Sequence, residues 1–446
     1  MGYSNQFFSA VNVRADSKTD VQSFSKKTGI PVVRLTYYND NNIVPSGKDL
    51  DAIVKLCGIT EIELKLNMGR LDKSILDAIR ANSTAITKLI NNSIVQHDIS
   101  KITPKIAFQT SLGVLYQENC LDILRQMESE SIDLIFTDPP FNLSKLYPSN
   151  IDDSLRTEKY LHWCQDWLHE CVRVLKHGGS LFLWNLPRWN SILSGYIDNY
   201  LTFRHWIGVD IKYSLPIAGR LYPSHYSLLY YIKGSRPKTF HPDRLPMLTC
   251  PKCYGDLKDY GGYKNKMNPN GVNLCDIWTD IPPVRHTKYK RREGANELSI
   301  KLMDRIIEMS SDEGDTVFDP FGGSGTTYMA AELKGRKWIG CEIGPVDDIK
   351  NRFSRISEEK EILESYREKL NTLFPKDVHK KRTELGLWVC ETFNNDENQT
   401  NAKLKEIANT CLRTDWLTPA IEVCVPKTTN SQIAPLIDEL NLVSGE

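Results

Sequence analysis

The run Ile132-Asp133-Leu134-Ile135-Phe136-Thr137-Asp138-Pro139-Pro140-Phe141-Asn142 is the stretch from which the fold of this chain is first read. Its largely apolar first half predicts a buried strand, and the strand is followed by an acidic residue, two prolines and an aromatic ring. Proline fixes its own φ and restricts the residue before it, so Asp138 and the Pro139 carbonyl are held at a stiff corner. Such a corner offers two hydrogen-bond acceptors to a planar amino group, although Asp-Pro-Pro also occurs in ordinary turns.

A second segment, Gly314 to Thr327 (GDTVFDPFGGSGTT), predicts a strand, a glycine-rich turn and the start of a helix. The glycines allow the backbone to approach a ligand closely, and Thr326 or Thr327 is expected to cap the helix, which ends before Gly335. Residues 337–342 predict the next strand, with Glu342 at its acidic end. This pattern is typical of a nucleotide-binding β-α-β unit in which Glu342 accepts hydrogen bonds from ribose hydroxyls; a generic tight turn is the alternative.

Asp-Pro-Pro-Phe at 138–141 and Phe-Asp-Pro-Phe-Gly-Gly-Ser-Gly at 318–325 together resemble the motifs of the amino DNA methyltransferases that use S-adenosylmethionine. The catalytic motif precedes the cofactor motif here, as in the permuted β group of that family. Residues 175–184 are similar to the family's helix, Gly-Gly turn and following strand, and residues 224–234 are similar to its later strand behind the base pocket. The commoner family form carries His-Pro-Thr and Lys-Pro elements that this chain lacks. The resemblance covers about residues 106 to 350.

The resemblance implies an α/β, Rossmann-like methyltransferase fold, with a mostly parallel twisted sheet flanked by helices. It divides the chain into a helix-rich N-terminal accessory region (1–105), a catalytic domain (106–350) and a C-terminal accessory region (351–446). Residues 50–57, Gly58 and residues 61–66 predict a helix, a glycine turn and a helix, which is weakly similar to a helix-turn-helix unit; a small helical accessory domain is the alternative. Residues 351–375 predict a charged amphipathic helix.

The same resemblance assigns the site residues. It implies that the target base is held by Asp138, Pro139, Pro140 and Phe141, and that S-adenosylmethionine is bound by Asp319, Phe321, Gly323, Gly325, Glu342 and Asn296. The Asp138 carboxylate and the Pro139 carbonyl accept hydrogen bonds from the exocyclic amine, and Phe141 stacks on the base once it is flipped out of the duplex. An acidic first residue favours adenine N6, whereas the cytosine N4 enzymes more often carry Ser-Pro-Pro.

The irregular interval 234–293, rich in Pro, Gly, Asn, Tyr and Lys, is where the β group carries sequence recognition. Cys250 and Cys253 in this interval resemble half of a structural zinc site, with Cys275 as a third ligand and His241 or His286 as a fourth. Free cysteines are the alternative, because a second Cys-x-x-Cys is missing. Residues 288–292 (KYKRR) form a basic patch that suits either phosphate contact or a solvated loop.

Composition limits the remaining options. A length of 446 residues suggests two or three domains, no apolar run is long enough to cross a membrane, and the formal net charge is zero. The zero net charge excludes a uniformly basic nucleic-acid coat, but not a local basic face. No signal peptide is evident and the 11 cysteines follow no disulfide framework, so a cytoplasmic location is expected.

We therefore predict a site-specific adenine methyltransferase acting on double-stranded DNA, with a cognate restriction endonuclease as its partner. A cytosine N4 methyltransferase is the nearest alternative. From other classes, a non-catalytic DNA-binding regulator and an enzyme that methylates RNA or a protein glutamine also stay open.

Overall fold

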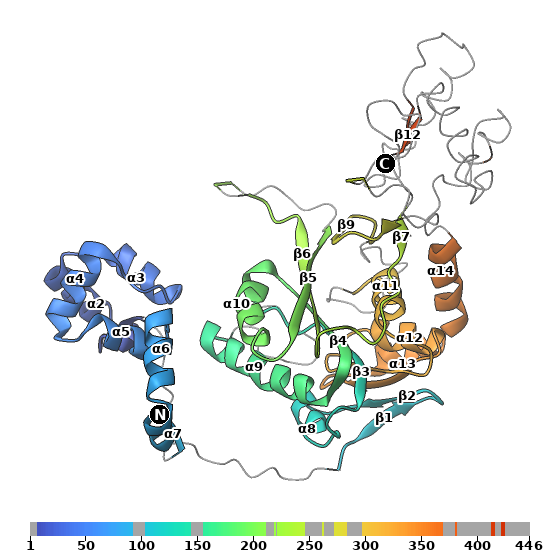
Figure 1. Ribbon diagram of the computed structural model, residues 1–446, viewed down its shortest axis with the longest axis horizontal. Coiled ribbons are helices and arrows are strands. Elements are labelled where there is room, and N and C mark those ends of the chain that lie inside the picture. Colours follow the sequence, from blue (N-terminus) through green and yellow to red (C-terminus); the bar gives the residue numbers. More distant parts are fainter. Residues whose placement is uncertain are drawn as a thin grey trace, which may run out of the picture. The chain divides into compact units, whose positions relative to one another are not determined.

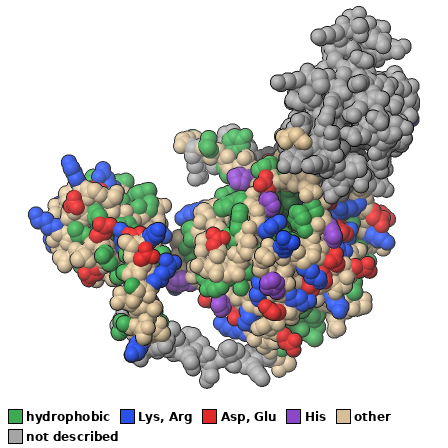
Figure 2. All heavy atoms as spheres, in the orientation of Figure 1, with side chains coloured by type: hydrophobic (Ala, Val, Ile, Leu, Met, Phe, Trp, Pro, Cys, Tyr) green, Lys and Arg blue, Asp and Glu red, His purple; other side chains and the backbone are tan. Residues whose placement is uncertain are grey.

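Figure 1 shows a computed structural model of the chain. It describes residues 7–91, 103–143, 155–210, 218–219, 221–245, 261–262, 272–282, 297–368, 380, 412–414 and 421–423. The contacts within the chain divide it into two compact units, one holding the helices of residues 7–91 and the other holding the strands and helices from residue 106 onward. Acidic and basic side chains are interspersed on the face seen in Figure 2, in keeping with the zero net charge.

The first unit is helical throughout its described part, with α1 (Phe7–Ala10), α2 (Lys18–Thr28), α3 (Val32–Asp40), α4 (Gly47–Cys57), α5 (Glu61–Asn67), α6 (Lys73–Ala81) and α7 (Ser83–Asn91). Local signals set the helix ends. Gly58 ends α4 in the left-handed conformation, and Thr60 Oγ1 accepts a hydrogen bond from the Glu63 amide at the start of α5. The predicted helix, glycine turn and helix are therefore present, packed on an apolar core that includes Leu35 and Ile53.

The second unit is built on a nine-stranded sheet of order β1-β2-β11-β10-β3-β4-β6-β5-β9 within the described residues. The strands β2, β11, β10, β3 and β4 run parallel, whereas β6 is antiparallel to both of its neighbours and β1 is antiparallel to β2. This mostly parallel sheet confirms the predicted α/β fold class. The strands are β1 (Ile106–Gln109), β2 (Gly113–Tyr116), β3 (Ile132–Thr137), β4 (Leu175–Asn185), β5 (Thr202–Asp210), β6 (His225–Ile232), β9 (Ile277–Trp278), β10 (Thr316–Asp319) and β11 (Lys337–Cys341).

Helices cover both faces of the sheet, which gives three layers. One apolar cluster joins the sheet to α11 (Ile300–Ser310), α12 (Thr326–Leu333), α13 (Asp347–Phe353) and α14 (Ile356–Glu368). The other joins it to α8 (Cys120–Leu124), α9 (Thr157–Val174) and α10 (Pro187–Ile197). In β3, Leu134 and Phe136 pack in the first cluster and Ile135 in the second, as expected for a strand buried on both faces.

Two local expectations differ from the structure. The Gly-Gly pair at 178–179 was predicted to form a turn before a strand, but β4 runs through both glycines with a shift in its register against β3. Gly178 has a φ of +82°, and a Cβ on Gly179 would lie 2.9 Å from the Lys176 carbonyl oxygen. The two glycines therefore form an irregularity inside the strand.

The end of the catalytic domain also differs from the sequence-based division. The boundary expected at residue 350 falls within α13, and the predicted single helix over 351–375 is split between α13 and α14. Ile349, Phe353 and Leu363 are buried in the same core cluster as α11 and α12. Both helices therefore belong to the catalytic unit.

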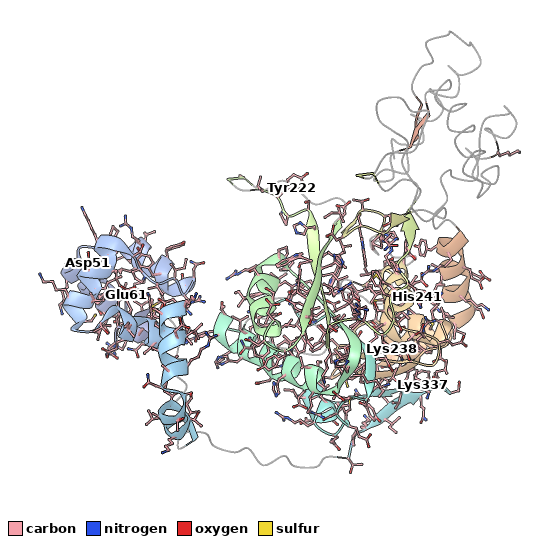
Figure 3. All side chains as sticks on the ribbon, in the orientation of Figure 1. Asp51, Glu61, Tyr222, Lys238, His241 and Lys337 are labelled. Atoms are coloured by element: carbon pink, nitrogen blue, oxygen red, sulfur yellow. The ribbon has the colours of Figure 1, made fainter. Side chains whose placement is uncertain are left out.

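The chain after β6 passes along the amino ends of the parallel strands, where Lys238 and His241 lie (Figure 3). Lys238 Nζ donates to Asp133 and Asp315, and His241 Nε2 lies 3.1 Å from Asp312 Oδ1. Two short ladders complete the described strands: β7 (Arg244–Leu245) with β8 (Val272–Asn273), and β12 (Leu412–Thr414) with β13 (Ile421–Val423). None of the described helices is long and apolar enough to cross a membrane.

Candidate active site

The carboxyl ends of three adjacent parallel strands bring the two sequence motifs together. Val317 of β10 pairs with Leu134 of β3, and Asp319 of β10 pairs with Gly340 of β11. The residues that follow these strands therefore meet at one edge of the sheet. β3 and β10 are neighbours in the sheet, but the chain continues from β3 to β4 and from β10 to β11, in opposite directions across the sheet. The carboxyl ends of β3 and β10 therefore form a topological switch point, where open α/β sheets bind ligands.

The acidic corner after β3 is held by buried donors from two helices. The Tyr160 hydroxyl of α9 donates to the Pro140 carbonyl at 2.7 Å, and Nε1 of Trp189 of α10 donates to the Phe141 carbonyl at 2.7 Å. Neither donor was identified from the sequence, because both act through side chains far from the motif. Within the described residues, the Pro139 carbonyl accepts no hydrogen bond, so it stays available as an acceptor.

The side chains of the corner differ in exposure. Asp138 is half-buried, whereas Phe141 is 8% exposed and its ring centroid lies 6.0 Å from that of Tyr226. The Tyr226 ring lies 4.8 Å from that of Trp184, at the end of β4. Phe141, which is expected to stack on the flipped base, belongs to an aromatic wall of Phe141, Trp184 and Tyr226. Its role in base stacking stays a prediction.

The glycine-rich turn after β10 depends on the absence of side chains. Gly323 and Gly325 have φ of +53° and +74°, a region that favours glycine. A Cβ on Gly325 would lie 2.9 Å from Ile349 of α13. Gly325 itself occupies the N-cap position of α12 and no side chain caps this helix, so the predicted threonine cap is wrong. The Thr327 hydroxyl donates instead to Asp319 at 2.6 Å.

The two acidic residues of the cofactor motif are buried and bonded to the turn itself. Asp319, 2% exposed, accepts hydrogen bonds from the Phe321 amide and from Thr327. Burial, reinforced by the charge of Glu342, raises the pKa of Asp319 to about 7. The Glu342 carboxylate accepts from the amides of Gly323 and Gly344, each at 2.8 Å. A carboxylate has about four acceptor positions, so Glu342 keeps capacity for a further donor.

Phe321 and a buried arginine support the turn from behind. The Phe321 ring packs against Trp163 and Trp167 of α9. On the other side, Arg352 of α13 donates to the Ser324 carbonyl and to the Thr326 hydroxyl, and pairs with Glu359 of α14. No local pattern pointed to this arginine, because its partners lie in two other segments, the glycine-rich motif and α14.

Some predicted site residues lie outside the described part of the chain. Asn296, Cys250, Cys253 and His286 are among them. Cys275 is described, half-buried, and its thiol donates to the Ile277 carbonyl. Among the described residues no three His, Cys, Asp or Glu side chains are grouped as metal ligands. The zinc site stays a prediction, as does the cofactor contact of Asn296.

Comparison with known proteins identifies the class. A family model for DNA methylases matches residues 132–349, from the first residue of β3 into α13. The chain is also 46% identical over 390 residues to the Type II methyltransferase M.BamHI of Bacillus amyloliquefaciens, covering 87% of this chain and 92% of that protein. The chain therefore belongs to the DNA methylase family and is a DNA methyltransferase, which confirms the resemblance drawn from the motifs.

Further relatives match about half of the chain. M.HpaI of Haemophilus parainfluenzae is 32% identical over 227 residues (50% of this chain, 68% of that protein), and the DNA adenine methyltransferase YhdJ of Escherichia coli is 31% identical over 243 residues (53% and 80%). Among solved structures, PvuII DNA methyltransferase, titled cytosine-N4-specific, matches with a TM-score of 0.43 and 20% identity over 58% of this chain and 95% of that chain.

Membership of this family establishes S-adenosylmethionine as the methyl donor, and the site fits that cofactor. The turn at 322–325 packs tightly against β11, because a Cβ on Gly322 would lie 3.0 Å from the Cys341 carbonyl oxygen. Its glycines therefore expose backbone, without side chains, to a ligand. Among the described residues, the hydrogen-bond donors to the neighbouring carboxylates of Asp319 and Glu342 are amide and hydroxyl groups. They therefore leave negative charge for a cationic ligand.

Proposed function

We propose that this protein methylates the exocyclic amino group of one base within a specific sequence of double-stranded DNA. The observation that carries the proposal is the half-buried Asp138 carboxylate at the end of β3, one strand away from the glycine-rich turn at the end of β10. The two lie on opposite sides of the switch point, so an amine held by Asp138 faces the cofactor site.

The corner supplies the acceptors that the reaction needs. An exocyclic amine is a weak nucleophile because its lone pair is delocalised into the base. Hydrogen bonds from the amine to the Asp138 carboxylate and the Pro139 carbonyl favour a pyramidal nitrogen and stabilise the positive charge that develops there. Bound S-adenosylmethionine supplies the electrophilic methyl group. Asp138 then accepts the proton that the methylated nitrogen releases.

The base must leave the duplex to reach this corner. Phe141, three residues after Asp138, forms a wall of aromatic rings with Tyr226 and Trp184, and Tyr226 is half-buried at the start of β6. Aromatic side chains stack favourably on extruded bases. We propose that this wall contacts the flat face of the base, with Phe141 as the ring that belongs to the acidic corner itself.

The acidic first residue of the corner favours adenine N6 as the acceptor. The adenine methyltransferase YhdJ is a relative over half of this chain, which supports the same assignment. Cytosine N4 is the second candidate, because the same two acceptors fit an amine on either base. The test is to incubate the protein with duplex DNA and methyl-labelled S-adenosylmethionine, digest the product and identify the labelled nucleoside. N6-methyladenine supports the first assignment, N4-methylcytosine replaces it, and no label contradicts the proposed activity.

We also propose that the enzyme is the modification component of a restriction-modification system with a cognate endonuclease. The relatives named as Type II methyltransferases, M.BamHI and M.HpaI, support this role. Genomic DNA from a host that expresses the chain should resist a nuclease cleaving the same site. Sequencing of modified bases in that DNA identifies the site, and an absence of any modified motif would argue against the role.

A further inference from the structure

Two consecutive carbonyls of the acidic corner are held by buried side chains, whereas the carbonyl before them is not. The Tyr160 hydroxyl donates to the Pro140 carbonyl and Nε1 of Trp189 donates to the Phe141 carbonyl, each at 2.7 Å. Tyr160 is 2% exposed and Trp189 is 3% exposed. Among the described residues, the Pro139 carbonyl accepts no hydrogen bond. The corner therefore has two acceptors in use directly after one that is available to a substrate.

The backbone of Pro140 connects the held carbonyls to the available one. Two torsions of Pro140, φ and ψ, lie between the Pro139 carbonyl and the Pro140 carbonyl. The pyrrolidine ring fixes φ at about −65°, so ψ is the torsion that can still rotate. The hydrogen bond from Tyr160 holds the Pro140 carbonyl in one direction, and this fixes ψ as well. Tyr160 therefore determines the direction in which the Pro139 carbonyl points.

Asn185, the last residue of β4, sets the direction in which Tyr160 donates. Oδ1 of Asn185 accepts a hydrogen bond from the Leu186 amide at 2.7 Å, and its Nδ2 donates to the Tyr160 oxygen at 3.1 Å. Asn185 is 0% exposed. A hydroxyl carries a single hydrogen, so an oxygen that accepts from Asn185 gives that hydrogen to the Pro140 carbonyl. The hydrogen bonds therefore run in one order, from Asn185 through Tyr160 to the corner.

The two donors are themselves fixed by packing. The ring centroids of Tyr160 and Trp189 lie 4.7 Å apart, and both rings belong to the apolar cluster that joins α9 and α10 to the sheet. Protein interiors are densely packed, so neither ring can follow a carbonyl that moves. The positions of these donors are therefore set by the cluster, and the corner takes its orientation from them.

We propose that Tyr160 and Asn185 are positioning residues for methyl transfer: together they aim the Pro139 carbonyl at the amine of the extruded base. The inference rests on the proposed function, because it takes the Pro139 carbonyl as one of the two acceptors of that amine. A displacement of about 1 Å in a reacting group can lower the rate about 10²-fold. Loss of the Tyr160 hydroxyl should therefore slow the chemical step without weakening the binding of the cofactor.

The experiment compares two buried tyrosines of the same cluster. Tyr160→Phe keeps the ring and its packing but removes the hydroxyl. Tyr231→Phe is the matched control, because Tyr231 is 0% exposed in the same apolar cluster and its hydroxyl donates to Asp198 at 2.9 Å. Asp198 lies at the end of α10, whereas Trp189 lies near its start. Both substitutions remove one hydrogen bond of a buried hydroxyl, but only the first one affects the corner.

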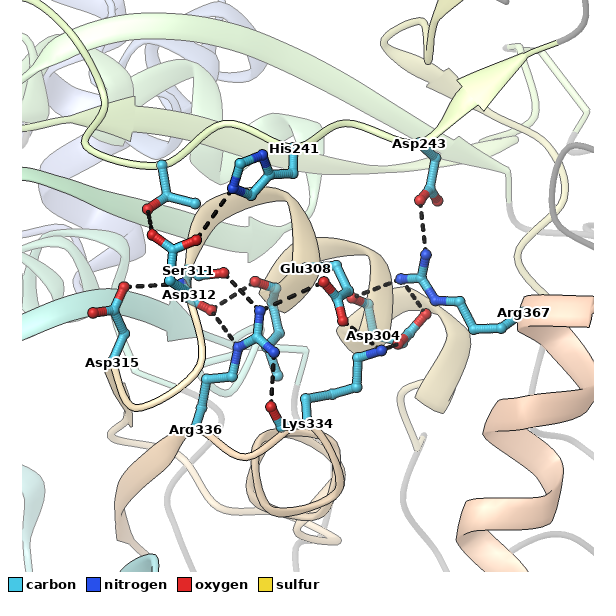
Figure 4. Close-up of polar contacts among 12 residues, drawn as sticks. His241, Asp243, Asp304, Glu308, Ser311, Asp312, Asp315, Lys334, Arg336 and Arg367 are labelled. Atoms are coloured by element: carbon cyan, nitrogen blue, oxygen red, sulfur yellow. Dashed lines mark hydrogen bonds and ion pairs between the residues drawn. The ribbon is translucent and has the colours of Figure 1, made fainter. Parts of the chain in front are cut away.

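Arg336→Lys is a second control, for the loss of a buried donor to a backbone carbonyl. Arg336 is 6% exposed and donates to the Ser311 carbonyl at 2.7 Å, the same distance as from Tyr160 to the Pro140 carbonyl (Figure 4). This contact lies just before β10 and β11, at the amino ends of the parallel strands. Its loss should lower the melting temperature and leave methyl transfer unchanged.

The rate of methyl transfer is measured in single turnovers of the full chain, with saturating cofactor and a duplex that carries the motif found by sequencing modified bases. The affinity for S-adenosylmethionine is measured by equilibrium binding. For Tyr160→Phe we expect the rate to fall by about 10- to 100-fold and the cofactor affinity to be retained. Tyr231→Phe and Arg336→Lys should transfer at the wild-type rate.

A second variant tests whether Asn185 acts through Tyr160. Asn185→Leu keeps a side chain of similar size but leaves the Tyr160 hydroxyl without the donor that orients it, so the rate should fall in the same direction. Because both residues act through one hydrogen bond to the Pro140 carbonyl, their effects should not be independent. The double variant should be no slower per folded molecule than Tyr160→Phe alone.

The outcomes separate this inference from the proposed function. If the wild-type chain transfers no methyl group to DNA, the proposed function fails whatever Tyr160 does. If the wild type is active and Tyr160→Phe keeps its rate, the inference is overturned and the proposed function stands. An equal loss of rate in Tyr231→Phe or Arg336→Lys would also overturn the inference. The same holds if the losses in Tyr160→Phe and Asn185→Leu multiply in the double variant.

Discussion

Buried carboxylates at the amino ends and at the carboxyl ends of the parallel strands have different partners; we call these two sides of the sheet its amino edge and its carboxyl edge. At the amino edge, Asp133 of β3 accepts hydrogen bonds from Lys176 and Lys238 and from the Thr316 amide. Burial alone raises the pKa of Asp133, but these donors outweigh it and the pKa is lowered. At the carboxyl ends of the strands, Asp319 accepts from one amide and one hydroxyl within the part of the chain that the structure describes, and burial raises its pKa to about 7.

The difference in partners indicates which carboxylates stabilise the fold and which are available to a ligand. The amino edge is neutralised by the chain's own lysines, so it has no need of a ligand. At the carboxyl edge, no lysine or arginine among the described residues forms an ion pair with Asp319 or Glu342. Buried negative charge without a partner is costly, and we propose that the positively charged groups of S-adenosylmethionine offset this cost when it binds.

The largest effect is expected at the acidic corner. Asp138→Ala removes one of the two acceptors that stabilise charge on the reacting nitrogen, so the rate of methyl transfer should fall by about 10²- to 10³-fold or more. The affinity for S-adenosylmethionine should be unchanged, because Asp138 lies after a different strand. Single-turnover kinetics and equilibrium binding measure the two quantities, and a variant that methylates at the wild-type rate would refute the role of Asp138.

The next effect is expected in the glycine-rich turn. Gly325→Ala places a side chain at a φ of +74° and within 2.9 Å of Ile349, which costs about 2 kcal/mol or more in backbone strain and overpacking. We expect the cofactor affinity to weaken by at least about 30-fold. Calorimetric titration of the purified variant checks this. Gly195→Ala, in α10 with open space around its Cβ, is the control and should bind normally.

A smaller effect should follow pH. A bound cation favours the ionised form of Asp319, so the affinity for S-adenosylmethionine should be constant above pH 7 and fall by about tenfold per pH unit below it. The stability of the unliganded protein should follow the opposite sign: because the folded pKa exceeds the unfolded one, this group destabilises the fold increasingly from about pH 4 to 7. Asp319→Asn should remove both trends, and a binding curve that is flat between pH 5 and 8 for the wild type would contradict the assignment.

The smallest effect on catalysis is expected at the amino edge. Asp133→Asn weakens a buried junction whose lysines are partly exposed, so the free energy of unfolding should fall by about 1–3 kcal/mol. The rate per folded molecule should stay at the wild-type value, since no cofactor or base contact is lost. Urea denaturation measures the free energy of unfolding and the single-turnover assay measures the rate of methyl transfer. A loss of rate comparable with that of Asp138→Ala would show that the amino edge also serves catalysis.

The strands and turns around the site were predictable because each is a local pattern. The apolar run 132–137, the strand formers at 316–318 and the positive-φ glycines each carry their signal within a few residues. The supporting contacts were not predictable, because Arg352, Tyr160 and Arg305 find their partners only after the sheet has formed. Phe141 shows the same limit: its aromatic character was evident, but its burial against Tyr226 depends on β6.

The strand order also has a consequence for the synthesis of this protein. β2 and β3 are made early, but β11 and β10 lie between them in the finished sheet. About 180 residues separate the end of β3 from β10, which corresponds to roughly 10–35 s of translation. During that time β3, whose six residues are all buried in the final fold, has one unpaired edge. A nascent chain of this protein therefore presents an aggregation-prone edge, and a ribosome-associated chaperone that covers it should raise the yield of active enzyme.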